Sequence, residues 1–219
     1  MDKKVFYKAL MLIMTVLFTL EVSAQEEAWK FKSEKEGLTI YSRSVDYSNI
    51  KELKITATVK SNLGTLVKIL DDVTLCPEWM YGCKTAEEVQ PADGTEAYDK
   101  ATLQFPKPFS YRVMLTRSTI DQDPDSKVVT VKTTSIPEEV PVDKSLVVIE
   151  KMVTTWVLTP TDSGEIEIES YLFCDPGGYI PAFLLNSLMD RGPTRTIKKL
   201  MKLLEKPEYQ NNTLPDIQD

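Results

Sequence analysis

Histidine is absent from this 219-residue chain. Its absence excludes Ser-His-Asp and Cys-His nucleophilic catalysis, and it removes the commonest zinc ligand. The chain also lacks Gly-rich phosphate-binding loops, C-x-x-C pairs and internal repeats. A formal net charge of −7 argues against nucleic acid as a partner and against strong electrostatic docking on anionic lipid surfaces. We therefore expect no cofactor, no metal site and no nucleic-acid partner, and we do not expect an enzyme.

Cysteine is scarce, with three residues in the chain. In an exported protein, three cysteines leave at least one unpaired. Cys76 and Cys83 could pair across the intervening Pro77–Gly82 segment, and free buried thiols are an equal alternative. Cys174 is then the odd residue.

A long hydrophobic run is also missing. The apolar stretch from Ala9 to Leu20 has about a dozen residues, whereas a membrane-spanning helix needs about 20. Lys3 and Lys4 precede it, and the small residues before Gln25 fit a cleavage site. The pattern predicts a signal peptide over residues 1–24 and export to a periplasm or to the medium, with a retained membrane anchor as the alternative.

The remaining chain divides into one domain, residues 25–205, and a tail. The tail, residues 206–219, is polar and has no hydrophobic periodicity, so we expect it to be disordered. The domain is long enough for one sizeable hydrophobic core.

Alternating patterns within the domain predict many antiparallel strands. In Leu53–Val59 every second residue is apolar, and in Glu165–Glu169 every second residue is charged. Short helices are expected at Glu26–Lys32 and from Leu63, and a long amphipathic helix ends near Leu204. This order predicts an α+β fold in which one strongly curved antiparallel sheet wraps around the carboxy-terminal helix.

Two charged residues fall on faces that otherwise read as apolar. Asp99 alternates with Ala97, Ala101 and Leu103, and Arg117 alternates with Val113 and Leu115. Since a lone buried carboxylate costs several kcal/mol, the pattern favours an Asp99–Arg117 ion pair. The alternative is that Arg117 extends outward at a strand end while Asp99 caps a bulge.

Several motifs in this order resemble the START family of lipid-transfer domains, within the wider helix-grip superfamily. The resemblance covers about Trp29 to Leu204. It is carried by Trp29 with Gly37–Arg43, Leu70-Asp71-Asp72 before Trp79, Phe105–Pro108 before Arg112, Trp156–Pro160, and Tyr171–Pro181 before the last helix.

The resemblance implies a hydrophobic cavity between the curved sheet and the carboxy-terminal helix. It also implies a lid made of that helix, interrupted at Gly192-Pro193, and of an omega-type loop, Ser135–Lys144. Several members keep an acid–Arg pair in the cavity, and either Arg112 or Arg117 could supply the cation here. The ligand-binding residues predicted in this way are Asp99, Arg117, Arg112, Trp79, Tyr111, Met152, Trp156, Leu185, Leu188 and Met189.

The resulting functional prediction is the binding, and possibly the carrying, of a lipid or other hydrophobic small molecule by a monomer that contacts membranes transiently. Two alternatives stay open. One is an exported interaction domain whose core is filled by side chains. The other is a cyclase-like or hydrolase-like enzyme of the same fold, for which an Asp99 paired with Arg would be too weak a base.

Overall fold

The computed structural model describes residues 28–90, 97–137, 146–188, 191–210 and 212–218. The predicted signal peptide lies outside these residues, as does most of the predicted Ser135–Lys144 loop. Among the helices within these ranges, none combines the length and the apolar character that crossing a bilayer requires.

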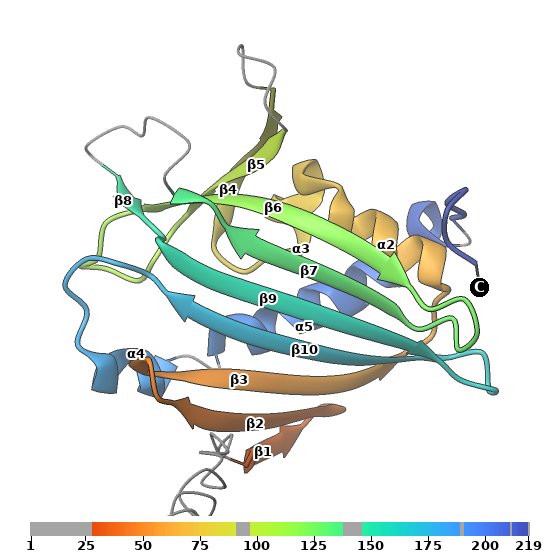
Figure 1. Ribbon diagram of the computed structural model, residues 1–219, viewed down its shortest axis with the longest axis horizontal. Helices are drawn as coiled ribbons and strands as arrows, with labels where there is room; N and C mark the ends of the chain where they lie inside the picture. Colours follow the sequence, from red (N-terminus) through yellow and green to blue (C-terminus); the bar gives the residue numbers. More distant parts are fainter. Residues whose placement is uncertain (1–27, 91–96, 138–145, 189–190, 211, 219) are drawn as a thin grey trace, which may run out of the picture.

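The strands form one strongly curved, ten-stranded sheet in the order β1-β2-β3-β10-β9-β7-β6-β5-β4, with β8 beside β6 (Figure 1). All pairings are antiparallel except that of β8 with β6. The strands are β1 Lys30–Lys35, β2 Leu38–Val45, β3 Ser48–Val59, β4 Cys83–Val89, β5 Tyr98–Leu103, β6 Arg112–Gln122, β7 Val129–Ser135, β8 Val147–Val148, β9 Lys151–Pro160 and β10 Ile166–Asp175.

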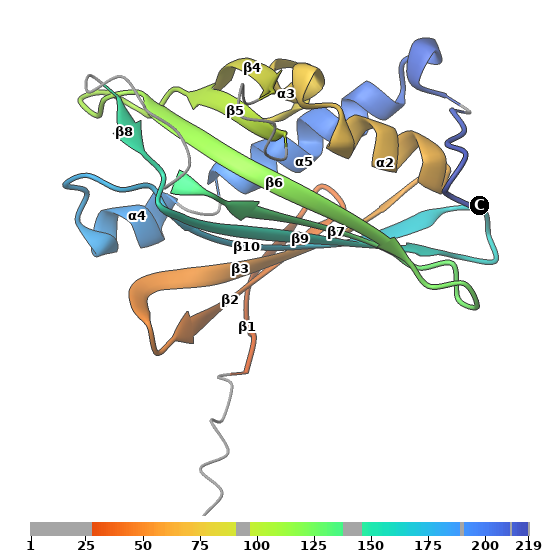
Figure 2. The same cartoon turned by 45° about the horizontal axis from the view of Figure 1, so that its top comes forward.

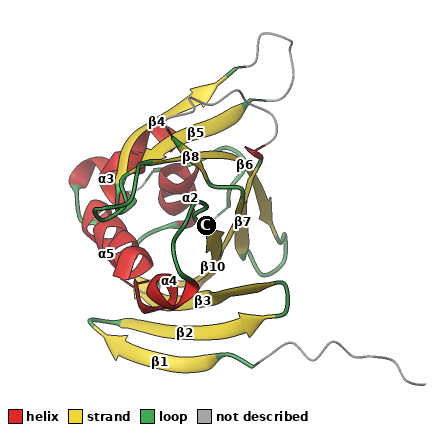
Figure 3. Cartoon of the chain, turned by 90° about the vertical axis from the view of Figure 1, so that its left-hand side faces the viewer, coloured by secondary structure: helices red, strands yellow, loops and turns green. Residues whose placement is uncertain are grey.

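The helices lie on the concave side of the sheet. Seen end on, the sheet curls around them, and α3, α5 and α4 cover its open side (Figure 3). Turning the molecule shows α2 and α5 side by side above the sheet (Figure 2). The helices are α2 Leu63–Asp71, α3 Cys76–Trp79, α4 Ala182–Leu188 and α5 Arg191–Leu204, with short 3-10 turns at Val73–Leu75 and Pro207–Tyr209. The predicted α+β helix-grip architecture is confirmed.

One end of the interior is solidly packed. Asn62 caps α2 by accepting a hydrogen bond from the Thr65 amide, and Leu63 and Leu66 of this helix are fully buried. Leu200 and Leu203 of α5 are buried against the same core. The two helices fill this end because their apolar stripes, spaced at helical periodicity, both face the sheet.

Three local predictions differ from the structure. Of the expected helix at Glu26–Lys32, residues 28 and 29 have no regular secondary structure and residues 30–32 begin strand β1, in which Phe31 pairs with Tyr41 of β2. Trp29 packs outside the sheet, with its ring 5.7 Å from that of Tyr171 and beneath the Arg43 guanidinium. Pairing across the sheet here overrides the local helical pattern.

The second difference concerns the last helix, which is divided into α4 and α5. Pro193 is the third residue of α5, within its first turn, where the backbone amide has no partner inside the helix. The Gly192-Pro193 pair therefore marks the start of a helix and not a weak point within one.

The third difference concerns the tail. The Asn212 amide donates to the Thr65 hydroxyl at 3.0 Å, and Leu214 and Ile217 pack against the main core. A Cβ added at Gly64 would lie 2.7 Å from the Asn212 carbonyl oxygen. Residues 212–218 are thus anchored to α2 and are not disordered, because two apolar side chains and the space left by a glycine give the tail a docking site.

Candidate functional site

The other end of the interior is hollow. A cavity of about 480 Å³ lies between the concave face of the sheet and the α3, α4 and α5 helices. Its apolar wall includes Trp79 and Trp156, whose rings meet edge to face with centroids 6.0 Å apart. Met114 of β6 and Met152 of β9 lie in the same wall. A cavity of this size falls within the range of small-molecule sites, about 300–1,000 Å³.

Small hydroxyl side chains of the central strands line the cavity where the filled end has Leu, Ile and Val. They are Thr116, Ser118, Thr133, Thr154 and Ser170. Ser118 and Thr133 are hydrogen-bonded to each other at 2.9 Å. Thr116 and Ser170 are only 2% and 7% exposed, and among the described residues their hydroxyls have no hydrogen-bonding partner. Because both side chains line the cavity, their hydroxyls offer surfaces at which a ligand can form hydrogen bonds.

Asp99 is the carboxylate in the cavity wall. It lies on β5 directly opposite Thr116 of β6, and both side chains face the cavity. Burial, followed by the nearby carboxylates of Asp71, Glu88 and Asp72, raises its pKa to about 6. Within the described chain no cation offsets these effects.

The predicted Asp99–Arg117 ion pair is wrong. Alternation along β6 places Thr116 and Arg117 on opposite faces, and the register pairs Asp99 with Thr116. Arg117 instead borders a smaller polar pocket of about 160 Å³, which adjoins the cavity at Asp99, Thr116 and Ser118. The argument that a salt-bridged Asp99 would be too weak a base therefore no longer applies.

The error has a physical cause: β6 is buried on both faces. Val113 and Leu115, which alternate with Arg117, form a separate cluster with Tyr98 on the outer face. Ile136, Leu146 and Val148 cover this cluster. Because both faces of the strand are apolar, alternation alone could not identify the face that lines the interior.

Arg112 lies on the same face of β6 as the cavity-lining residues, but its guanidinium is hydrogen-bonded to backbone carbonyl groups around the cavity mouth. Its guanidinium donates to the carbonyl oxygens of Ser110, Pro176 and Gly177, and it stacks over the Phe105 ring at 4.5 Å. The side chain is 2% exposed. These bonds link the β5–β6 loop to the β10–α4 loop, so Arg112 positions the mouth and is not a lining residue.

The β10–α4 loop depends on two glycines. Gly177 and Gly178 have φ of +65° and +67°, and a Cβ on Gly177 would lie 2.7 Å from the Val148 carbonyl oxygen. Only glycine satisfies both the left-handed backbone and the close approach. The loop then brings Ile180 and Leu185 into the cavity wall.

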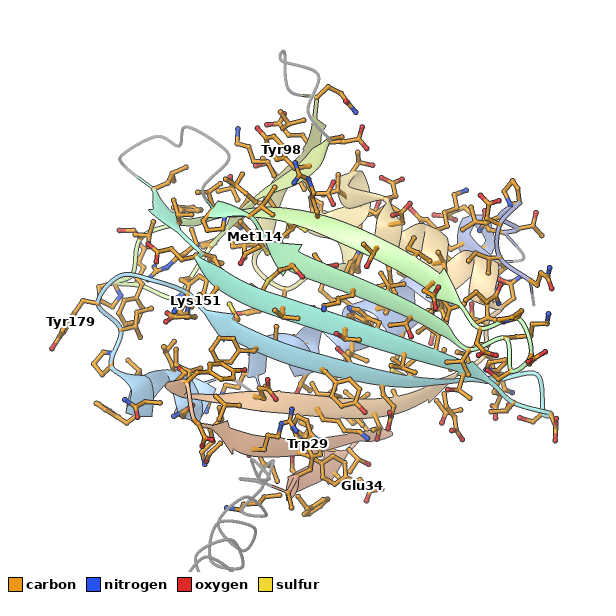
Figure 4. All side chains as sticks on the ribbon, viewed as in Figure 1. Trp29, Glu34, Tyr98, Met114, Lys151 and Tyr179 are labelled. Carbon is orange, nitrogen blue, oxygen red and sulfur yellow. A yellow bond between two sulfur atoms is a disulfide. The ribbon has the colours of Figure 1, made fainter. Side chains whose placement is uncertain are left out.

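Exposed aromatic side chains stand beside this mouth. Tyr179 is 94% exposed and Phe183 is 77% exposed. Tyr179 projects from the end of the molecule at which the β10–α4 loop lies (Figure 4). Large apolar groups that lie this far out of the protein mark a surface suited to contact with another apolar phase.

Polar side chains help to hold helices α4 and α5 over the cavity. The Asn186 side chain accepts from the Lys51 amide and donates to the Asn49 carbonyl oxygen. On α5, the Thr196 hydroxyl accepts from the Tyr81 amide, and Arg195 donates to the Tyr81 hydroxyl. Arg191 and Arg195 line the cavity at its α5 side.

The cysteines follow one of the two expectations. Cys76 and Cys83 form a disulfide with a Cα–Cα distance of 6.1 Å, and Cys174 is the free residue. Cys174 lines the cavity, and burial, followed by the charge of Asp175, raises its pKa to about 12. The thiol therefore stays protonated and unreactive at neutral pH.

Among the residues predicted from sequence, Asp99, Trp79, Met152, Trp156 and Leu185 lie in the cavity wall. Arg112, Arg117 and Tyr111 do not, while Met189 and the side chain of Leu188 lie outside the described part of the chain. The hydroxyl-bearing residues were missed. The alternation of Val129, Val131 and Thr133 in β7 is the signal that could have found one of them, because it places Thr133 on the same face as two buried valines.

A curved sheet that closes over helices α3, α4 and α5 and leaves a largely apolar cavity between sheet and helices defines a protein of the hydrophobic-ligand-binding helix-grip class. The START domain family model matches residues 13–209, and the chain therefore belongs to the START domain family, whose members generally bind lipids or other hydrophobic ligands.

Individual relatives agree with this assignment. An uncharacterized protein of Pseudomonas aeruginosa is 27% identical over 197 residues, which cover 88% of this chain and 96% of the relative. The crystal structure of a STAR-related lipid transfer protein from Xanthomonas axonopodis is 27% identical, with a TM-score of 0.74, over 82% of this chain and all of that one. Human StAR-related lipid transfer protein 5 has a TM-score of 0.69 and 16% identity over 90% of this chain and 96% of its own, and thus shows the shared fold.

Proposed function

We propose that the protein binds a lipid or similar hydrophobic small molecule in the cavity and carries it as a monomer. The observation that supports this most directly is the cavity of about 480 Å³ beneath α4 and α5. A chain that leaves water for an apolar cavity gains about 0.8 kcal/mol per CH₂ group. The START relatives whose names include lipid transfer support the same reading.

Exchange of the ligand requires an opening, and we place it at α4 and the β10–α4 loop. Within the described chain, Asn186 provides the two side-chain hydrogen bonds between α4 and β3. Arg112 holds the neighbouring β10–α4 loop through the backbone carbonyls of Pro176 and Gly177. Movement of α4 as a unit can therefore open the cavity while the sheet stays intact.

Tyr179 and Phe183 support transient membrane contact at this opening. Both rings are exposed next to the cavity mouth, and amphipathic aromatic rings favour the membrane interface. A ligand that enters there would pass from bilayer to cavity without crossing bulk water.

The test is native mass spectrometry of the purified protein, combined with displacement of a fluorescent apolar probe. We expect non-covalent adducts that disappear on denaturation, and we expect added lipid to displace the probe. A bare protein mass together with no probe binding would contradict the proposal and would favour an interaction domain.

We propose binding and not catalysis. The alternative of an enzyme would rely on Asp99, because the pKa of its carboxyl group is raised. Perturbed carboxyl pKa values are typical of catalytic acids and bases as well as of binding sites. Turnover of an ester or an aromatic polyketide that is lost in Asp99→Asn would overturn this part of the proposal.

We also propose that the protein is exported to a periplasm or secreted. The basic, then apolar, amino-terminal sequence supports export, and so does the Cys76–Cys83 disulfide, since disulfides persist in oxidising compartments. Alkylation of the denatured, unreduced protein should modify one of the three cysteines; modification of all three would count against export.

A further inference from the structure

Asp99 and Thr116 form a polar position in an otherwise apolar wall. They are directly opposite in the β5–β6 register, where facing side chains approach to about 5 Å. Both belong to the cavity and to the smaller pocket that adjoins it. In the described part of the chain, neither the Asp99 carboxylate nor the Thr116 hydroxyl has a hydrogen-bonding partner.

The charges around this position are mainly negative. Asp71 and Asp72 lie at the carboxy-terminal end of α2, and Glu88 lies on the neighbouring strand β4. Their carboxylates raise the pKa of Asp99, and burial together with Asp72 and Glu88 raises the pKa of Asp71. The carboxy-terminal end of a helix adds a partial negative charge of its own.

The cation that borders this region does not neutralise it. Arg117 lies on the opposite face of β6 and reaches only the smaller pocket. It is not among the groups that shift the pKa of Asp99. A group bound inside the cavity at Asp99 therefore meets a negative potential and two hydrogen-bond acceptors.

We propose that the ligand is an amphiphile with a cationic amine head group, which binds between Asp99 and Thr116 while its apolar chain occupies the rest of the cavity. This inference rests on the proposed function and specifies the ligand class. An ammonium group has three donors and no acceptor, so it can satisfy the Asp99 carboxylate and the Thr116 hydroxyl together. The Ser118–Thr133 hydroxyl pair lies next in the wall and offers a further acceptor.

An anionic head group would have to bind elsewhere. At Asp99 it would meet a like charge at close range in a poorly hydrated site, which costs several kcal/mol. Arg191 and Arg195 line the cavity on the α5 side and would attract an anion there. A bound amphiphile could therefore place an amine head group at the inner wall or an anionic head group at α5. Amphiphiles that differ only in head-group charge distinguish these two orientations.

The experiment compares dodecylamine, dodecanol and dodecanoate as competitors for the apolar probe on the full purified protein. The three share one chain and differ in head group. At about pH 8 we expect dodecylamine to displace the probe at a concentration roughly tenfold or more below that of dodecanoate, with dodecanol between them. The Asp99→Asn variant should lose most of this preference. Glu87→Gln is the matched control, since this exposed acid on β4 pairs with Lys100.

The preference should also depend on pH. Because the pKa of Asp99 in the free protein is about 6, the carboxylate is charged at about pH 8 and largely neutral at about pH 5. Dodecylamine stays protonated and dodecanol stays neutral throughout, so the advantage of the amine over dodecanol should shrink as the pH falls through this range. Dodecanoate is left out of this comparison because its own carboxylate titrates near the lower limit of the range. Asp99→Asn should remove the pH dependence, which a purely structural role of Asp99 would not do.

The outcomes separate the two proposals. If none of the amphiphiles displaces the probe, or if the probe itself does not bind, the proposed function fails. If dodecanoate competes as well as dodecylamine, or if Asp99→Asn keeps the preference for the amine, the head-group inference is overturned while the binding function stands.

Discussion

The two ends of the interior differ although one sheet covers both. At the filled end, α2 and the last turns of α5 press Leu63, Leu66, Leu200 and Leu203 against the strands. At the hollow end, α4 and the first turns of α5 pass over Thr116, Ser170 and other small side chains, and a cavity of about 480 Å³ remains.

The difference shows how the fold separates stability from binding. Branched apolar side chains that interlock at the filled end supply packing and burial, which dominate the free energy of folding. The hollow end forgoes part of that gain and keeps a space for a ligand. Substitutions at the filled end should therefore mainly change the free energy of unfolding, whereas substitutions at the hollow end should mainly change ligand binding.

The largest effect is expected from truncation at the filled end. Leu200→Ala leaves a void beneath a fully buried side chain and should lower the free energy of unfolding by about 2–5 kcal/mol. Leu185→Ala, at the wall of the existing cavity, should cost less than about 1.5 kcal/mol because no new closed void forms. Denaturant unfolding measures both.

Lys202→Ala, an exposed position on the same helix as Leu200, is the control and should change stability by less than about 0.5 kcal/mol. Equal losses for Leu200→Ala and Leu185→Ala would mean that the hollow end is as tightly packed as the filled end.

Filling the hollow end should mainly affect binding. Ser170→Phe places a ring in the cavity from the middle of β10 and should weaken probe binding by roughly tenfold or more. The free energy of unfolding should change by less than about 1.5 kcal/mol, since the ring enters open space and not a packed core.

Ser170→Ala retains the space and serves as the matched control, with binding close to that of the wild type. Probe titration and denaturant unfolding should be run on the same preparations. A Ser170→Phe variant that binds normally would show that the ligand does not occupy this part of the cavity.

A smaller effect is expected when the aromatic rings outside the mouth are removed. Tyr179→Ser combined with Phe183→Ser should slow ligand transfer between vesicles several-fold, because each inserted ring contributes up to about 1.5–3 kcal/mol of apolar burial. Equilibrium binding of the soluble probe should be unchanged, since neither residue lines the cavity.

Phe31→Ser is the control for general loss of surface aromatics. Phe31 is 61% exposed on edge strand β1, which β2 and β3 separate from β10. If this variant slowed transfer as much as the double variant, contact with the membrane would not be specific to the mouth.

Alternation predicted much of the sheet. Leu53, Ile55, Ala57 and Val59 face inward as expected, because β3 has one polar face and one apolar face. The same rule failed for β6, where Arg112, Met114 and Thr116 face inward and Val113 and Leu115 are covered from outside. When both faces of a strand are buried, the alternation of its residues does not show which face lines the interior. The position of Arg117 was therefore not predictable from periodicity.

The amino-acid sequence by itself determined the α+β class, the strand pattern, the amphipathic last helix and the placement of Asp99 on an inward face. These properties depend on local periodicity, which one strand or helix carries alone. Only the tertiary structure decided that α4 and α5 are separate helices, that Arg112 is bound to backbone carbonyls, and that the tail is docked. It also decided that Asp99 faces Thr116, with no cation from the described residues beside it. Each of these depends on partners from distant segments, and register, burial and local potential arise only when those segments meet.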